Sequence, residues 1–132
     1  MTNSSKHVDV LILDDDLDLL TTTAELLAEM GYKVKGFADP VSALEFAMGQ
    51  TFSVGLIVFR LGSVKNGLDV VETMQALGCK SVYVMVSADV ESSTQVRALD
   101  LKLFEFMRKP VAPESLLATV ERAMAHSQQM AA

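Results

Sequence analysis

The chain has 132 residues, of which half are hydrophobic, and its 11 Lys and Arg against 17 Asp and Glu give a net charge of −6. This length and composition predict one domain with a full hydrophobic core, and the negative charge argues against a nucleic-acid or acidic-membrane partner. Because Cys79 is the only cysteine, and neither a signal-type segment nor an apolar run of about 18 residues occurs, we expect a cytoplasmic protein without an internal disulfide.

Five apolar runs of strand length recur along the chain. They cover residues 8–13, 32–37, 54–59, 81–86 and 103–107. The first, third and fourth runs are almost continuously aliphatic, which is typical of strands that are buried on both faces of a parallel sheet. The second run alternates between apolar and polar side chains and therefore predicts an edge strand.

Segments with helical periodicity lie between and after these runs, at residues 17–30, 40–48, 68–77, 90–99 and 112–124. The side chains expected on their buried faces are Leu20, Ala24, Leu27 and Met30, then Val41, Leu44 and Ala47, then Val71, Met74 and Leu77, and finally Leu116, Leu117, Val120 and Met124. The alternation predicts a three-layer α/β sandwich with right-handed crossovers. We expect one domain over residues 1–132, with a core at 8–126 and frayed tails at 1–7 and 127–132.

Polar side chains follow four of the predicted strands. They are Asp14, Asp15 and Asp16 after the first, Arg60 after the third, Ser87 after the fourth, and Arg108 and Lys109 after the fifth. Because the carboxyl ends of parallel strands form the ligand-binding edge of an open sheet, these carboxylates, the hydroxyl and the ammonium are predicted to share one crevice. No glycine-rich loop follows any of the strands, which argues against a nucleotide site.

Four pieces of the sequence, in this order, resemble the receiver domain of bacterial two-component response regulators. They are residues 11–16, 67–71, 86–88 and 104–110, and the resemblance covers nearly the whole chain. It implies a flavodoxin-like, doubly wound parallel sheet of five strands in the order 2-1-3-4-5, with five helices. It also implies a part in phosphorelay signalling rather than an enzyme, and a cis peptide bond between Lys109 and Pro110.

The resemblance assigns roles to individual residues. Asp14 and Asp15 match the acidic pair that holds Mg²⁺ in the family, and carboxylate oxygens are the ligands that this hard cation prefers. Ser87 and Lys109 match the residues that bind the phosphoryl group. Phe106 matches the aromatic residue that acts as a conformational switch.

The main departure from the family concerns the phosphate-accepting Asp at the end of the third strand. That position falls on Val58, and no Asp or Glu occurs anywhere in residues 46–68. Shifting the alignment by one or two residues places Ile57, Phe59 or Arg60 at the acceptor position, and none of these side chains can form an acyl phosphate. We therefore expect a degenerate acceptor position, with Mg²⁺ bound weakly or not at all and no cofactor required.

Further departures and ordinary structural roles accompany these assignments. Lys102 and Leu103 stand where the family has Gly and a small residue before the fifth strand, and Gly62 stands where it has Pro. Asp16 is expected to cap the first helix. The ammonium of Lys109 is expected to balance the acidic pair, and Arg60 either does the same or points to solvent. Without a phosphoryl group, we expect Ser87 to cap its loop and Phe106 to belong to the core.

Three functions are compatible with this sequence. The leading hypothesis is a pseudo-receiver that acts as a protein-interaction module for a histidine kinase, an output domain or another receiver, with a homodimer through the fourth helix, fifth strand and fifth helix. The alternative is a phosphotransfer-competent receiver that uses Asp14 or Asp15 with Mg²⁺. A flavodoxin-like enzyme ranks last, because the chain lacks a glycine-rich loop, a general-base His and a nucleophile.

Overall fold

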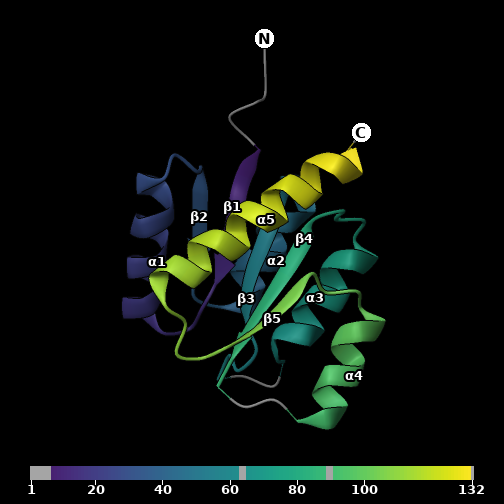
Figure 1. Cartoon of the computed structure of the whole chain (residues 1–132). Helices are drawn as coiled ribbons and strands as arrows, with labels where there is room; N and C mark the ends of the chain where they lie inside the picture. The colour runs from purple at the N-terminus through teal and green to yellow at the C-terminus, as the bar shows by residue number, and fades with distance from the viewer. Residues whose placement is uncertain (1–6, 63–64, 89–90, 132) are drawn as a thin grey trace.

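The computed structural model describes residues 7–62, 65–88 and 91–131 (Figure 1). Five strands, β1 (Val8–Leu13), β2 (Val34–Phe37), β3 (Phe52–Val58), β4 (Val82–Ser87) and β5 (Glu105–Arg108), form one parallel sheet in the order β2-β1-β3-β4-β5. The helices are α1 (Leu17–Glu29), α2 (Pro40–Gly49), α3 (Gly67–Ala76), α4 (Ser92–Asp100) and α5 (Pro113–Ala131). The predicted fold and strand order are confirmed.

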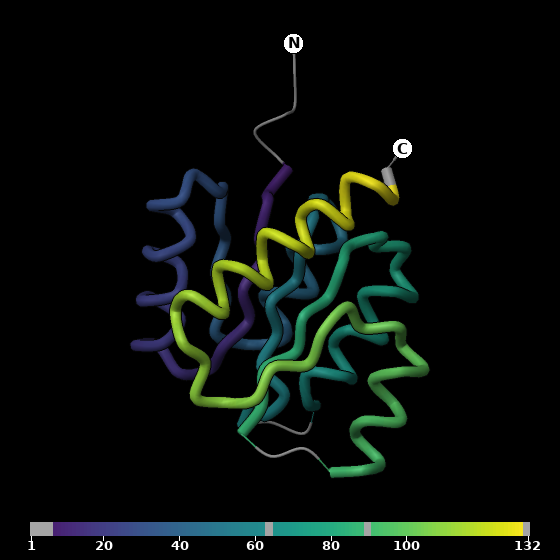
Figure 2. Tube along the Cα trace, viewed as in Figure 1, coloured from purple at the N-terminus to yellow at the C-terminus, as the bar shows by residue number. Residues whose placement is uncertain are grey.

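The helices cover both faces of the sheet. The chain passes from β1 to β2 in one direction along the sheet, and from β2 through β3 and β4 to β5 in the other direction. Because the crossovers are right-handed, helices that connect strands in opposite directions lie on opposite faces of the sheet. Helix α1 therefore lies on one face and α2, α3 and α4 on the other, while α5 crosses the sheet on the face of α1 (Figures 1 and 2). Within the described residues, no helix has the length and hydropathy that a membrane crossing needs.

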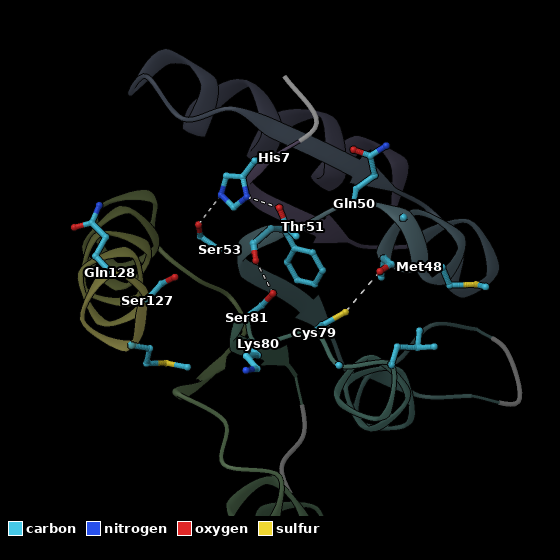
Figure 3. Close-up of a pocket in the computed structure, with 16 residues that line it drawn as sticks. His7, Met48, Gln50, Thr51, Ser53, Cys79, Lys80, Ser81, Ser127 and Gln128 are labelled. Carbon is cyan, nitrogen blue, oxygen red and sulfur yellow. Dashed lines mark hydrogen bonds between the residues drawn. The ribbon is translucent and has the colours of Figure 1, made fainter. Parts of the chain in front are cut away.

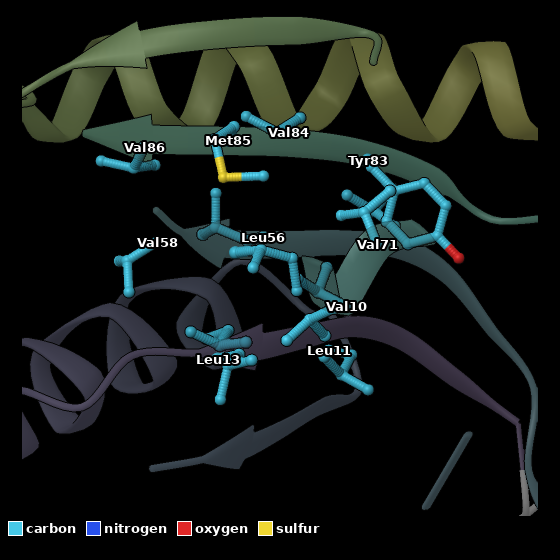
Figure 4. Packing of buried hydrophobic residues seen from close by; sticks show 14 of the residues in the cluster. Val10, Leu11, Leu13, Leu56, Val58, Val71, Tyr83, Val84, Met85 and Val86 are labelled. Atoms are coloured by element: carbon cyan, nitrogen blue, oxygen red, sulfur yellow. The ribbon is translucent and has the colours of Figure 1, made fainter. Parts of the chain in front are cut away.

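Burial follows the predicted strand types. Every residue of β4 is buried, and β1 and β3 each have one half-buried residue, Asp9 and Ser53. The packed side chains of these central strands are shown in Figure 4. Strand β2 has no fully buried residue among those described, as expected for an edge strand. The sheet is thus held by a continuous aliphatic layer at its centre.

The predicted helix faces are wrong at their ends. Met30, Val41 and Leu77 were expected to be buried but are 59%, 65% and 46% exposed. Each lies at an end of its helix: Met30 and Leu77 are the C-caps of α1 and α3, and Val41 is the second residue of α2. The small side chains of Ala43 and Ala123 are buried in the middle of α2 and α5.

The sequence predicted the fifth helix over 112–124 and a tail at 127–132, of which the structure describes residues 127–131. Helix α5 continues through these residues, and Ser127 is still half-buried on the domain. The predicted helix ends earlier because the apolar periodicity fades after Met124 although the helix does not. Residues 1–6, the start of the fourth helix at Val90 and the final Ala132 lie outside the described residues.

Three helices end in the same hydrogen-bonded turn. In α1 and α3 the residue after the C-cap is glycine, with φ of +94° at Gly31 and +93° at Gly78. In α4 the corresponding residue is Lys102, with φ of +60°. Its N–H donates to the Leu99 carbonyl at 3.0 Å, which completes one bond of this turn. A side chain at positive φ is strained, so this turn costs more in α4 than in the other two helices.

Candidate functional site

The acidic residues after β1 lie in different environments. Asp14 is buried, its N–H donates to the Phe37 carbonyl at 3.0 Å, and its Oδ1 accepts from the Asp16 N–H at 2.9 Å. Burial raises the pKa of the Asp14 carboxyl, and the backbone N–H of Asp16 and the positive charge of Lys109 oppose this increase only in part. Asp14 is thus a desolvated carboxyl whose ionised form is destabilised.

Asp15 lies beside the loop after β3, whereas Asp16 caps helix α1. Asp15 is exposed, and a Cβ added to Gly62 would lie 3.1 Å from its Oδ2, so the loop after β3 passes directly beside this carboxylate. Asp16 is the N-cap of α1, and its Oδ1 accepts from the N–H groups of Asp18 and Leu19 at 3.1 and 3.2 Å. The capping role predicted for Asp16 is confirmed.

Val58 is the last residue of β3 and is 6% exposed. The register pairs Leu13 of β1 with Ile57 of β3, so Asp14 and Val58 come next on adjacent strands at the same edge. Figure 4 shows Val58 between Leu13 and Val86 at the end of the sheet. An apolar side chain thus lies level with the buried carboxyl of Asp14.

Helix α3 begins directly against the end of β3. A Cβ at Gly67 would overlap the carbonyl oxygen of Val58, so only glycine allows this approach. The Gly67 N–H donates to the Phe59 carbonyl at 2.7 Å. The N-terminus of α3 is therefore fixed to the end of β3.

Ser87 and Lys109 meet at the ends of β4 and β5. Ser87 is buried, and its carbonyl accepts from the Lys109 N–H at 2.8 Å. Lys109 is half-buried, and its charge acts on Asp14 as predicted for a counter-ion. The predicted cis peptide bond between Lys109 and Pro110 is confirmed.

Phe106 lies in β5, and Arg60 lies in the loop after β3. Phe106 pairs with Met85 in the sheet, and its half-buried side chain packs against the core. Arg60 is exposed, and its guanidinium carbon lies 5.9 Å from the ring centroid of Phe59. Of its two predicted positions, Arg60 therefore takes the solvent-facing one.

The residues at this edge fit Mg²⁺ poorly. In the part of the chain that the structure describes, no three His, Cys, Asp or Glu side chains are grouped so that they could hold a metal ion. The predicted metal pair supplies two carboxylates, Asp14 and Asp15, because that of Asp16 caps α1, and the apolar Val58 lies level with Asp14. Since Mg²⁺ prefers oxygen ligands and dehydrates reluctantly, this pair with an apolar neighbour is a weak donor set.

A pocket that the sequence did not predict lies at the other end of the strands, where β1, β3 and β4 begin. It has a volume of about 760 Å³ and lies beside the C-terminal ends of α2, α3 and α5 (Figure 3). His7 is exposed, and its Nδ1 lies 2.7 Å from Thr51 Oγ1 and its Nε2 3.0 Å from Ser53 Oγ. Burial raises the pKa of the Cys79 thiol in the same pocket, so this thiol is a poor nucleophile.

Comparisons with known proteins agree with the family suggested by the motifs. The family model described as the response regulator receiver domain matches residues 10–121. The transcriptional regulatory protein ZraR of Escherichia coli K12 is 29% identical over 92% of this chain and 27% of its own length. The alginate biosynthesis transcriptional regulatory protein AlgB of Pseudomonas aeruginosa is 30% identical over 87% of this chain and 25% of its own length. The chain thus spans about a quarter of these relatives.

Solved structures share the fold. A CheY-like receiver domain protein from Methanospirillum hungatei has a TM-score of 0.86 and 24% identity, over 95% of this chain and 98% of that one. NtrX from Brucella abortus has a TM-score of 0.83 and 25% identity, over 93% of this chain and 28% of that one.

Proposed function

The chain belongs to the response regulator receiver domain family of two-component signalling, and we propose that it acts as a protein-interaction module that is not phosphorylated at the end of β3. The observation that carries the proposal is Val58, a buried aliphatic residue that ends β3. Its side chain has no nucleophilic atom to accept a phosphoryl group. Asp14, Asp15, Ser87 and Lys109 then form a remnant of the phosphorylation pocket, with Asp14 and Lys109 balancing each other's charge.

The partner surface in this proposal is the face of α4, β5 and α5. A groove of about 470 Å³ lies on it, with Ala98, Leu103 and Phe106 among its lining residues. Val96 and Leu99 of α4 are 58% and 78% exposed on the same helix, which supplies apolar area for an interface. A histidine kinase, an output domain or another receiver is the expected partner, and the names of ZraR and AlgB favour an output domain that controls transcription.

A homodimer through this face would bury more than about 1,000 Å² in total. Light scattering at rising protein concentration is expected to detect it, and Leu99→Glu is expected to weaken it. A strict monomer at every concentration would contradict the homodimer and leave the interaction with a different partner to be tested.

A phosphotransfer-competent receiver is the second candidate, with Asp14 or Asp15 as the acceptor and Mg²⁺ as the metal. The observation in its favour is that Asp15 is exposed to solvent. Two features weigh against it. Asp14 is buried and hydrogen-bonded to the Asp16 N–H, and modifying either Asp would remove one of the two carboxylates that are available for Mg²⁺.

The two candidates differ in their reaction with a small acyl phosphate donor in the presence of Mg²⁺. We expect intact-protein mass spectrometry to detect no phosphoryl adduct on the wild-type chain. The variant Val58→Asp restores the carboxylate, and Val58→Asn is its matched uncharged control. An adduct on the wild type that peptide mapping assigns to Asp14 or Asp15 would establish the second candidate and overturn the first.

A further inference from the structure

Helix α4 has little apolar attachment to the rest of the domain. Among its described residues Ala98 alone is buried, while Val96 and Leu99 are 58% and 78% exposed. Its N-cap residue, Glu91, makes no side-chain capping bond with the described residues of the helix. Most helices are kept in place by packing an apolar face against the core, so α4 must be kept in place by other contacts.

Polar contacts with α3 keep α4 in place. The Arg97 Nη2 lies 2.9 Å from Asp69 Oδ1 and 2.9 Å from Glu72 Oε1. The Gln75 side-chain amide donates to the carbonyl of Leu101, the C-cap of α4, at 2.7 Å. Three residues on successive turns of α3 therefore bind the C-terminal half of α4. Isolated surface ion pairs contribute little, but a guanidinium that joins two carboxylates forms a network.

Asp69 also binds the N-terminus of α3. Its Oδ2 accepts from the Asn66 N–H at 2.8 Å, and its own N–H donates to Asn66 Oδ1 at 3.0 Å. This reciprocal capping box fixes the first turn of α3. Gly67 follows in that turn and lies against the carbonyl of Val58. One carboxylate thus bonds on one side to the turn that contacts the end of β3 and on the other side to α4.

We infer that Asp69 and Arg97 form the link through which the end of β3 fixes the position of α4. The path runs from the Val58 carbonyl through Gly67 and the Asn66–Asp69 capping box to Arg97. It consists of packed backbone, the hydrogen bonds of the capping box and an ion pair, and it does not pass through Ser87 or Phe106. Arg97 is a positioning residue in this link. The inference does not depend on whether the β3 edge is phosphorylated.

The first test measures backbone hydrogen–deuterium exchange in α4 of the whole chain. Arg97→Gln keeps much of the side-chain length but removes the charge. It is expected to speed exchange in residues 92–101 at least threefold, while β1, β3 and β4 stay protected. The matched control is Arg122→Gln, which breaks the comparable 2.9 Å ion pair with Glu105. Because salt screens exposed ion pairs, high NaCl should speed α4 exchange in the wild type but not in Arg97→Gln.

The second test measures the coupling to the end of β3. Asn66→Ala removes the cap oxygen and is expected to speed exchange in α4 as well as in the first turn of α3. Asp39→Ala removes the corresponding cap of α2 and should affect α2 alone. Asn66→Ser keeps a cap oxygen and should restore protection in α4. Unchanged α4 exchange in Arg97→Gln, or loosening confined to α3 in Asn66→Ala, would overturn the inference.

Discussion

Replacing Val58 with Asp is expected to destabilise the metal-free protein by about 2–3 kcal/mol. Val58 is 6% exposed, and losing its burial costs about 1.5 kcal/mol. The new carboxylate also joins Asp14 and Asp15 at one edge of the sheet, where two like charges repel by about 1 kcal/mol even in water. Lys109 offsets part of this repulsion, because its charge already acts on Asp14.

The same substitution is expected to make the stability of the protein depend on Mg²⁺ more strongly than in the wild type. A third carboxylate completes an oxygen donor set with Asp14 and Asp15, so Mg²⁺ should bind the folded variant. At a hundredfold excess over Kd, such binding restores about 2.7 kcal/mol of stability. Thermal and urea unfolding with EDTA or with Mg²⁺ measure both effects.

Val58→Asn separates charge from lost burial, because it has the shape of Asp without the ionised oxygen. We expect it to lose about 1.5 kcal/mol and to gain little from Mg²⁺. If Val58→Asp were as stable as the wild type in EDTA and gained nothing from Mg²⁺, residue 58 would not face the acidic pair. The assignment of this edge as the remnant pocket would then be wrong.

Three further substitutions test single features of the fold. Asp14→Asn keeps an acceptor for the Asp16 N–H and removes the buried charge, so it should stabilise the protein at neutral pH by about 1 kcal/mol. The pKa of the Asp14 carboxyl is higher in the folded protein than in the unfolded chain. The wild type should therefore lose stability relative to this variant as the pH rises from the unfolded pKa through the folded pKa. Equal denaturation midpoints of the two proteins across pH 3–8 would refute this pH dependence. Lys102→Gly should relieve the strain of a side chain at φ of +60° and raise stability by about 1 kcal/mol, whereas Gly78→Ala, in the equivalent turn of α3, should lower it by a similar amount. A Lys102→Gly variant no more stable than the wild type in urea would contradict this account of the turn.

The sequence predicts the sheet well because aliphatic runs report burial directly. The central strands are found within two residues of their predicted bounds, and the alternating run at residues 32–37 contains the edge strand β2. Helix periodicity is less informative at helix ends. It indicates which side chains share a face but not where the sheet stops, which is why Met30 and Leu77 are exposed.

The site is only partly predictable for the same reason. Strand ends bring Asp14 and Ser87 to one edge, but nothing in three consecutive Asp residues indicates that the first is buried and the second exposed. The link between Asp69 and Arg97 joins two consecutive helices across the intervening strand β4, and no local sequence pattern pairs their side chains. Only the part of the link within α3, the capping box at residues 66–69, has a local sequence signal that could have indicated it.

The central claim is that the domain is not phosphorylated at the end of β3 and therefore does not undergo the change that phosphorylation would cause. Its most direct test is an NMR titration of the wild-type chain with beryllium fluoride and Mg²⁺, which together mimic a phosphorylated Asp. We expect the backbone amide shifts of Ser87 and Phe106 to stay unchanged in the wild type and to change in Val58→Asp. Large shifts in the wild type that spread from Ser87 to α4 would contradict it.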